Sequence, residues 1–285
     1  MNKKILIWAS SILVAILLFS FFFFSSKSIA DFHVVAKGGE VSVLQNGEWI
    51  VLTQSEQFFK NIDAIKTTEG EAILTIKQAT IITVDPNSEI KIDDLTDDSL
   101  KISQVQGSSW NKFLALTGIK SYDVQTTHTV ASVRGTGFYV KPGSEFDTFM
   151  LGEGELALEG WNDTLKPFQK VIVYENQTYE LQNLTEEEIQ FLKLRISEDL
   201  DKIKKIRETI FDANKNTIST IKKLTSTTDE DFTNLIEDID EGRVDDKQKM
   251  EESPIPLPND VEKIVQINEK IKEQKSLISI LSQNE

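Results

Sequence analysis

The sequence has no cysteine and only two histidines, His33 and His128, among 285 residues. Without cysteine the chain can form no disulfide, no thiolate zinc site and no thiol nucleophile. Two histidines are too few for a histidine-rich metal site and offer little material for a Ser-His-Asp triad. His128 lies in a stretch typical of a strand, where a packing or surface role is the favoured interpretation. The sequence therefore predicts a protein without enzymatic activity and without a cofactor.

Basic residues are also in the minority, with 31 Lys and Arg against 46 Asp and Glu and a net charge of −15. Such a chain is not expected to present a basic surface to a nucleic acid, so no nucleic-acid partner is predicted. The pairs Asp93-Asp94 and Asp97-Asp98 offer oxygen ligands, but their order does not match a calcium-binding EF-hand loop. A solvated loop is the favoured interpretation, and no metal site is predicted.

One long apolar run stands near the N-terminus. Ile5 to Phe24 carry no charge and follow Lys3 and Lys4. Twenty helical residues span about 30 Å, the thickness of a bilayer core. The preceding lysines place the N-terminus in the cytoplasm and the bulk of the chain outside. The run therefore predicts a single-pass anchor in the cell membrane, and the alternative is a signal peptide cleaved after Ala30, which would make the protein secreted.

The distribution of glycine divides the rest of the chain. Twelve of the thirteen glycines lie between Gly38 and Gly160, and the other is Gly242. Between residues 31 and 183 short alternating runs are separated by turn residues such as Asn46-Gly47, a dipeptide suited to a two-residue hairpin. This pattern predicts an all-β domain, either a β-sandwich or a β-helix-like stack of short antiparallel strands.

A helical pattern begins after this region. Thr185 and Glu188 have the spacing of a capping box and open a predicted long helix over residues 184–228. Four isoleucines repeat every seven residues and define a seam suited to a coiled coil: Ile189, Ile196, Ile203 and Ile210. The seam either packs against another helix of the same chain or binds a second copy, which would give a homo-oligomer through the helical region.

The C-terminal part contains a connector and a last helix. Residues 229–258 form an acidic connector whose last residues begin the "SPIPLPND" stretch (Ser253 to Asp260), which is too rich in proline to be helical. A short helix inside this connector is predicted to end at Gly242, since glycine is a common C-cap. Residues 259–285 form a predicted helix with a stripe of isoleucines.

The stretch "TVASVRGTGFYV", from Thr129 to Val140, has a strand pattern interrupted by Arg134-Gly135-Thr136-Gly137. One interpretation is an anion site, in which amides next to the glycines form a nest and the arginine supplies charge. No helix pattern follows, as a phosphate loop would require. The favoured interpretation is a bulge or a tight turn that uses glycine for a positive φ, with the arginine paired to a carboxylate.

Several segments of the β region, in the same order, resemble the FecR domain of extracytoplasmic proteins. They are Asn61 to Ile76, Pro86 to Ile92, Val105 to Trp110, Ala131 to Val140 and Gly152 to Leu158. The "VRGT" block is the most specific of them, and Arg134, Gly135, Thr136 and Phe138 are its family positions. The resemblance implies a sensing, scaffolding or partner-binding role. The family's founding members are anti-sigma regulators with a large cytoplasmic domain, whereas this sequence has only Met1 to Lys4 before its apolar run.

Together these features predict a membrane-anchored, extracytoplasmic binding or scaffold protein that acts through protein–protein contact and whose protein partner is unknown. A transmembrane signalling regulator is one alternative. A binding protein for envelope polysaccharide is another, in which Trp49, Trp110 and Trp161 would line a glycan groove.

Overall fold

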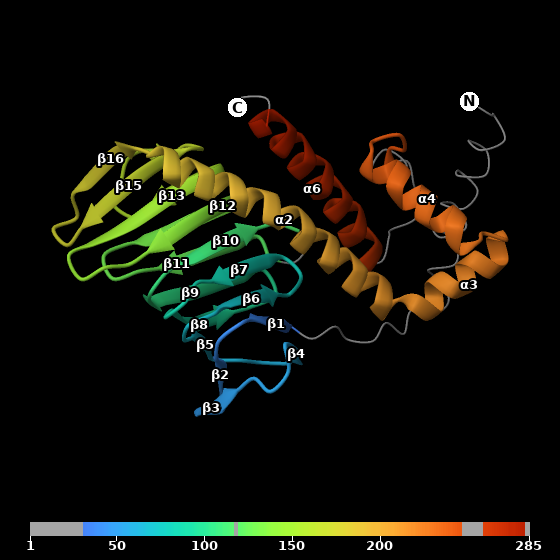
Figure 1. Ribbon diagram of the computed structural model, residues 1–285, viewed down its shortest axis with the longest axis horizontal. Coiled ribbons are helices and arrows are strands. Elements are labelled where there is room, and N and C mark those ends of the chain that lie inside the picture. Colours follow the sequence, from blue (N-terminus) through green and yellow to red (C-terminus); the bar gives the residue numbers. More distant parts are fainter. Residues whose placement is uncertain (1–30, 117–118, 247–258, 283–285) are drawn as a thin grey trace. The chain divides into compact units, whose positions relative to one another are not determined.

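The computed structural model describes residues 31–116, 119–246 and 259–282. Strands come first and helices follow, which confirms the predicted fold class of a mainly β region with an α-helical C-terminal region (Figure 1). The strands are β1 (Phe32–Lys37), β2 (Val41–Gln45), β3 (Glu48–Val51), β4 (Glu56–Phe59), β5 (Ala64–Thr67), β6 (Glu71–Ile76), β7 (Thr80–Val84), β8 (Glu89–Leu95), β9 (Ser99–Gln106), β10 (Ser109–Phe113), β11 (Ser121–Gln125), β12 (Val130–Lys141), β13 (Phe146–Leu158), β14 (Thr164–Leu165), β15 (Gln169–Tyr174) and β16 (Tyr179–Asn183). The described helices are α2 (Glu186–Ala213), α3 (Lys215–Thr225), α4 (Asp229–Asp240) and α6 (Asn259–Ser282).

The chain divides into two compact units, with a boundary between Asp199 and Leu200 inside helix α2. We call Ala30–Asp199 the β unit and Leu200–Glu285 the helical unit. The β unit thus includes the first part of α2 and extends past the domain end predicted at residue 183. None of the described helices is both long and apolar enough to cross a membrane, and the predicted span Ile5–Phe24 lies outside the described residues.

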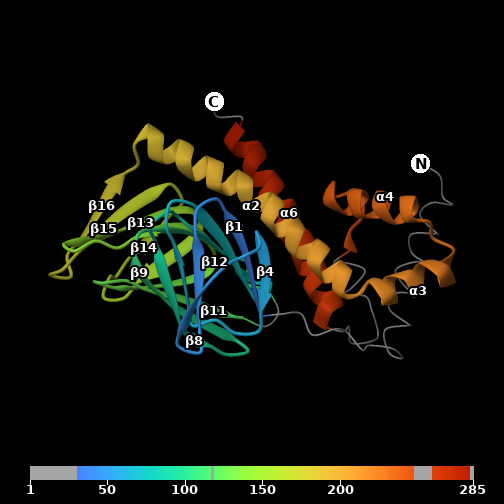
Figure 2. The same cartoon turned by 60° about the horizontal axis from the view of Figure 1, so that its bottom comes forward.

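The strands of the β unit form a single sheet of sixteen strands that curls on itself (Figures 1 and 2). The path runs β3-β2-β5-β8-β9-β11-β12-β10-β7-β6-β1-β4, and β13 to β16 branch from β12. Neighbouring strands are antiparallel except β9 and β11, which are parallel. One continuous sheet of stacked strands is closer to the predicted stack than to a sandwich of two separate sheets.

Strand β12 joins the two halves of this path. Its first part pairs with β11 from Val130 to Val133, and its second part pairs with β10 from Gly137 to Val140. Strand β13 pairs with both parts, and the register shifts around Gly137. The "RGTG" stretch is therefore a bulge inside β12, at the point where the strand stops pairing with β11 and begins to pair with β10.

This bulge changes which side chains of β12 face the core. Ala131 and Val133 are buried before it, and Phe138 and Val140 are buried after it. Because strand side chains alternate between faces, an unbroken strand would bury Val133 and leave Phe138 on the opposite face. The extra residue of the bulge restores both to the core.

The helical unit departs from the predicted single helix over 184–228. Helices α2 and α3 are separate, because Asn214 between them has a non-helical backbone (φ −103°, ψ 12°). Its side-chain amide binds the backbone oxygen of Ile210 at 2.9 Å, a local hydrogen bond that competes with helix continuation.

The other predicted helices are present. Helix α4 starts with a capping box in which the Thr228 hydroxyl accepts from the Asp231 N–H. Its last residue is Asp240, and the predicted Gly242 terminates it with a φ of +70°: the Gly242 N–H donates to the Ile239 oxygen at 3.0 Å and the Arg243 N–H to the Asp238 oxygen at 2.8 Å. Helix α6 begins at the predicted residue 259. The capping box of Thr185 and Glu188 at the start of α2 is also confirmed, with bonds of 2.8 and 3.2 Å.

Candidate functional site

Four glycines meet where β12 and β13 pair across the bulge, and we call them the glycine crossing: Gly135, Gly137, Gly152 and Gly154. Gly135 and Gly154 have φ values of +62° and +81°, a region that only glycine adopts freely. A Cβ on Gly154 would lie 2.6 Å from the Gly135 backbone oxygen. The two strands therefore approach more closely here than any side chain would permit.

The other two glycines make room for Trp110. A Cβ on Gly137 would lie 3.0 Å from the indole ring, and one on Gly152 would lie 2.7 Å from it. The indole lies against this glycine surface and is only 1% exposed. Its Nε1 donates to the Asp199 Oδ2 at 2.9 Å. The glycine crossing thus holds a tryptophan that binds helix α2 within the β unit.

Helix α2 covers the same place with an apolar residue. The Ile196 Cδ1 lies 3.2 Å from the position that a Cβ on Gly152 would occupy, and Ile196 is fully buried. Phe191, one turn earlier, packs edge-to-face on Tyr139 of β12 with ring centroids 5.1 Å apart. The first part of α2 is therefore attached to the sheet by aromatic, apolar and polar contacts together.

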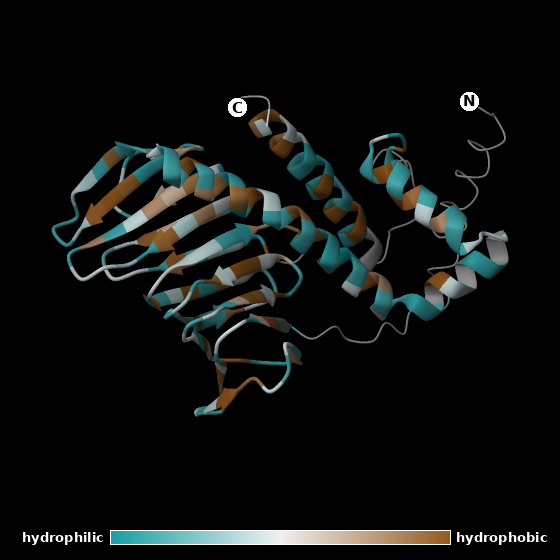
Figure 3. Cartoon of the chain, in the orientation of Figure 1, coloured by the Kyte–Doolittle hydropathy of each residue, from teal (hydrophilic) through white to brown (hydrophobic). Residues whose placement is uncertain are grey.

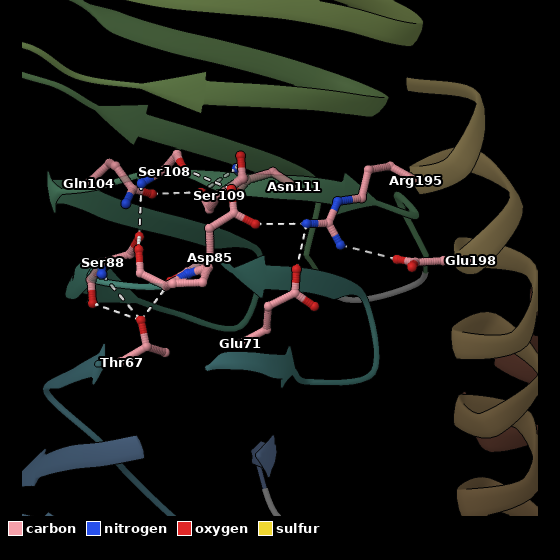
Figure 4. A network of polar contacts seen from close by, with 11 residues as sticks. Thr67, Glu71, Asp85, Ser88, Gln104, Ser108, Ser109, Asn111, Arg195 and Glu198 are labelled. Carbon is pink, nitrogen blue, oxygen red and sulfur yellow. Dashed lines mark hydrogen bonds and ion pairs between the residues drawn. The ribbon is translucent and has the colours of Figure 1, made fainter. Parts of the chain in front are cut away.

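Beside this contact lies a buried cluster of charges around Arg195, shown in Figure 4. The Arg195 guanidinium is 2.7 Å from the Glu71 carboxylate on β6 and 2.8 Å from the Asp85 carboxylate that follows β7. A third carboxylate, Glu198 on the same helix, lies 3.2 Å away. We call these four residues the Arg195 cluster. It joins one helix to two strands through three negative charges and one positive charge.

Burial and the neighbouring charges both shift the pKa values of groups in and next to the cluster. Burial raises the pKa of the Asp85 carboxyl, although the 2.7 Å hydrogen bond from Ser108 and the charge of Arg195 act in the opposite direction. Burial also raises the pKa of Tyr139, and the nearby Asp85 charge adds to that effect. Burial alone would lower the pKa of Arg195, but its carboxylate partners outweigh burial and raise it.

A chain of neutral hydrogen bonds supports Asp85 from the strand side (Figure 4). The Thr67 hydroxyl donates to the Asp85 backbone oxygen at 2.6 Å and accepts from the Ser88 N–H at 3.1 Å. The Ser88 hydroxyl accepts from the Ser108 N–H at 2.9 Å. Asp85 is therefore fixed on both its backbone and its side chain, as expected of a residue whose position holds a buried cation.

The family positions of the "VRGT" block have structural places. Phe138 is fully buried, and the buried Thr136 hydroxyl donates to the Glu155 backbone oxygen at 3.1 Å. Arg134 is exposed and, within the described residues, makes no ion pair, contrary to the pairing predicted for it. Its register neighbour Glu155 binds Lys166 instead, at 2.6 Å.

Three of the four seam isoleucines are fully buried and one is half-buried. Ile196 belongs to the β unit, and Ile203 and Ile210 to the helical unit. The half-buried residue is Ile189. Their side chains are covered within this chain, so a second copy is not needed to cover them.

The remaining sequence candidates are not members of the Arg195 cluster. Asp93 accepts from the Ser103 hydroxyl at 2.6 Å, and Asp97 pairs with Lys77 at 3.2 Å. Within the described residues no group of three or more His, Cys, Asp or Glu side chains could hold a metal ion. Trp110 is buried and cannot line a glycan groove, and Trp161 stacks on Tyr179 with centroids 5.9 Å apart.

Sequence reasoning missed the Arg195 cluster and the Trp110 contact. A signal for them is present in α2, where Leu192, Arg195, Ile196 and Asp199 recur at helical spacing. An arginine and an aspartate on the apolar face of an amphipathic helix indicate buried polar partners. The partners themselves are 110 and 89 positions away in the sequence, so their identity is not visible in any local pattern.

No family model matches the sequence, and no curated protein matches it either. Among solved structures, two crystal structures of a proposed anti-sigma factor from Parabacteroides distasonis, at 2.50 and 1.65 Å resolution, match with 18% identity and a TM-score of 0.37. The match covers 42% of this chain and 59% of the other. The matched region thus spans about three fifths of those structures, and a similarity of this size decides neither family nor function.

Proposed function

We propose that the protein is a membrane-anchored, extracytoplasmic scaffold with a FecR-like β domain, which acts through protein–protein contact and without catalysis. The FecR-like segments, which occur in the same order along this sequence as in the FecR domain, support the domain assignment. The uncharged run from Ile5 to Phe24, preceded by two lysines, supports the anchor and its orientation. The bulk of the chain would then lie outside the cytoplasm.

The main support for a role without catalysis is that the buried polar side chains bind one another. Arg195 binds Asp85 and Glu71, and Trp110 binds Asp199, so these buried side chains attach a helix to a sheet. Perturbed pKa values in an enzyme would instead serve a reacting group. Here Asp85 and Arg195, whose pKa values are both shifted, bind each other, as in a structural ion-pair network, which supports a role without catalysis.

The anchor and its orientation can be tested with single cysteines, because the natural sequence contains none. In the full-length Asn176→Cys variant, a membrane-impermeant maleimide should label intact cells, since Asn176 is exposed on the β unit. The matched Asn2→Cys variant should be labelled only after lysis. Labelling of Asn2→Cys in intact cells, or release of the wild type from membranes at alkaline pH, would refute the proposed topology.

Protein contact can be tested by crosslinking full-length protein in native membranes, followed by purification in detergent and mass spectrometry. The expected result is a defined protein that is captured in a constant ratio. If no protein is captured above the level of an unrelated anchored control, and a purified envelope polysaccharide binds instead, the scaffold proposal fails in favour of glycan binding.

A signalling regulator is the second candidate, because the predicted span ends at Phe24, shortly before β1 begins at Phe32. A change in the β unit would then be close in sequence to the membrane. Photocrosslinkers placed within Ile5–Phe24 should capture a second membrane protein if this function holds. Their failure to capture one would remove signalling through the span.

A further inference from the structure

Strand β3 ends the sheet and is the most exposed apolar strand of the β unit. It pairs only with β2, and all four of its residues are exposed. Trp49, Ile50 and Val51 are 38%, 43% and 47% exposed, and they stand consecutively. Figure 3 colours most of this strand as hydrophobic. Edge strands are usually protected by lysine, proline or a bulge, and none of these occurs within Glu48–Val51.

The hairpin fixes which backbone groups of β3 face outward. Asn46 and Gly47 form its two-residue turn, with φ values of 53° and 82°, so Gln45 and Glu48 are the hydrogen-bonded pair next to the turn. Backbone pairing alternates along an antiparallel ladder. The N–H and C=O groups of Trp49 and Val51 therefore point away from β2, toward an open edge.

We propose that this edge binds the β3 edge of a second copy of the chain, in an antiparallel pair centred on Ile50. In that register Trp49 lies opposite Val51 of the second copy, and Ile50 lies opposite its own equivalent. In each pair of Trp49 with Val51 of the other copy, the two outward N–H groups donate to the two outward carbonyls, and the two-fold axis relates the two pairs. Both sheets then continue through the contact.

The side chains of β3 favour a second copy of the same strand as the partner. Each large apolar side chain meets another apolar side chain, and an aromatic opposite a β-branched residue is a favourable cross-strand pair. The only charged residue of the strand, Glu48, lies opposite Leu52 and not opposite a second glutamate. A contact between copies therefore needs no sequence beyond the one already present.

The other candidate surfaces for self-association fit less well. The seam residues Ile196, Ile203 and Ile210 are buried. At the other end of the strand path, β4 exposes Phe58, which stacks on His33 with ring centroids 4.3 Å apart. Strand β16, which ends the branch from β12, offers a single strongly exposed apolar residue, Leu181. A four-residue strand pair buries far less than the roughly 1,200–2,000 Å² of a standard interface. The dimer is therefore expected to be weak and to form at high local concentration.

Disulfide trapping tests the register directly. At the non-hydrogen-bonded pair formed by Ile50 and its equivalent, the Cα atoms lie about 4.5 Å apart, within the range that a disulfide spans. The full-length Ile50→Cys variant in detergent should give a covalent dimer under mild oxidation. Glu48→Cys, on the same strand and equally free of competing cysteines, should remain monomeric because its equivalents are far apart in this register. Equal crosslinking of the two variants, or none for Ile50→Cys, would overturn the proposal.

A second measurement does not depend on oxidation. Ile50→Glu places two negative charges opposite each other and should abolish the concentration-dependent dimer in sedimentation velocity, while circular dichroism stays unchanged because Ile50 is at an exposed edge. Leu181→Glu on β16 is the matched control and should dimerise as the wild type does. If Leu181→Glu abolishes the dimer and Ile50→Glu does not, or if the wild type is monomeric at millimolar concentration, the β3 contact is refuted.

Discussion

Helix α2 carries two buried arginines of equal exposure, one in each unit, and their surroundings differ in charge. Arg195 in the β unit faces three carboxylates. Arg207 in the helical unit binds one carboxylate, that of Asp240, through Nη1 at 2.5 Å and Nη2 at 2.9 Å. Its Nη1 also donates to the Asn268 amide oxygen at 2.8 Å. Both are 6% exposed. Burial alone therefore does not determine how such a cation is held.

The difference follows from what each arginine joins. In the helical unit, Asn268 donates to Asp246 at 2.8 Å, and Lys272 adds a second cation at 3.2 Å, so the charges are balanced. In the β unit the excess negative charge is tolerated because serine, threonine and backbone groups bind Asp85. The same helix is therefore attached to a sheet by hydrogen-bonded carboxylates, and to other helices by a network of balanced charge.

The largest expected effect is the loss of either arginine. Arg195→Met and Arg207→Met should each lower the free energy of unfolding by about 3–5 kcal/mol, because each leaves buried carboxylates without a cation. Hydrogen exchange should rise in β6 and β7 for the first variant and in α4 and α6 for the second. The additional change Asp85→Asn should restore part of the loss in Arg195→Met only. A loss below 1 kcal/mol in urea denaturation of either single variant would contradict this.

The next largest effects on stability are expected from glycine substitutions, which should cost more in the β unit than in the helical unit. Gly152→Ala forces a Cβ to within 2.7 Å of the Trp110 ring and should cost about 1–3 kcal/mol through overpacking. Gly242→Ala in the helical unit meets no atom within 4 Å and has a φ of +70°, so only backbone strain of about 1 kcal/mol is expected. Tryptophan fluorescence should shift for Gly152→Ala and not for Gly242→Ala. Equal stability of the two variants would show that the glycine crossing is not tightly packed.

Acidification should change the stability contributions of two carboxyl groups, one in each unit, in opposite directions. The pKa of Asp85 is raised in the folded state, so its charged form costs stability at neutral pH, and that cost is relieved as pH falls through the raised pKa. The pKa of Glu241 is lowered by its hydrogen bond from Lys275, so its contribution is present above the unfolded pKa and is lost as pH falls through the lowered one.

These signs are measured by urea denaturation at pH 7 and pH 4 of Asp85→Asn and Glu241→Gln beside the wild type. Relative to Asp85→Asn, the wild type should gain stability on acidification, and relative to Glu241→Gln it should lose stability. The same sign for both comparisons would contradict the assignment.

The smallest effects are expected at exposed arginines. Arg134 in the β unit makes no ion pair within the described residues, and Arg243 in the helical unit pairs with Asp238 at 2.6 Å on the surface. Arg134→Ala and Arg243→Ala should each change the free energy of unfolding by less than about 1 kcal/mol. A larger loss for Arg134→Ala would give this family position a structural role that its exposed side chain does not indicate.

Local patterns were sufficient for the elements of this fold and insufficient for their assembly. The Asn46-Gly47 hairpin, the Thr185 capping box and the start of α6 depend on neighbouring residues, so the sequence predicts them. The break at Asn214 also has a local cause, but the isoleucine repeat that precedes it, from Ile189 to Ile210, predicted a helix that continues and concealed the side-chain competition.

Long-range pairing produced the features that were missed. The parallel contact of β9 with β11, the double pairing of β12, and the contact of Asp85 with Arg195 each join residues that no periodicity relates. The candidate site was predicted only through its glycines. Their positive φ values and close contacts are conditions that only glycine meets, and such conditions are visible in a sequence as unusual clusters of that residue.

The bulge in β12 also sets a limit on how this chain can vary in length. Deleting one residue between Arg134 and Phe138 would turn Phe138 and Val140 toward solvent and bring Tyr139 and Lys141 inward, so the lost residue would exchange the two faces of the strand's second half. The loop between β12 and β13, residues 142–145, lies outside the paired part of the two strands, so a change in its length leaves the faces of β12 unchanged. Among related chains, differences in length should therefore gather in that loop and be absent from the "RGTG" stretch.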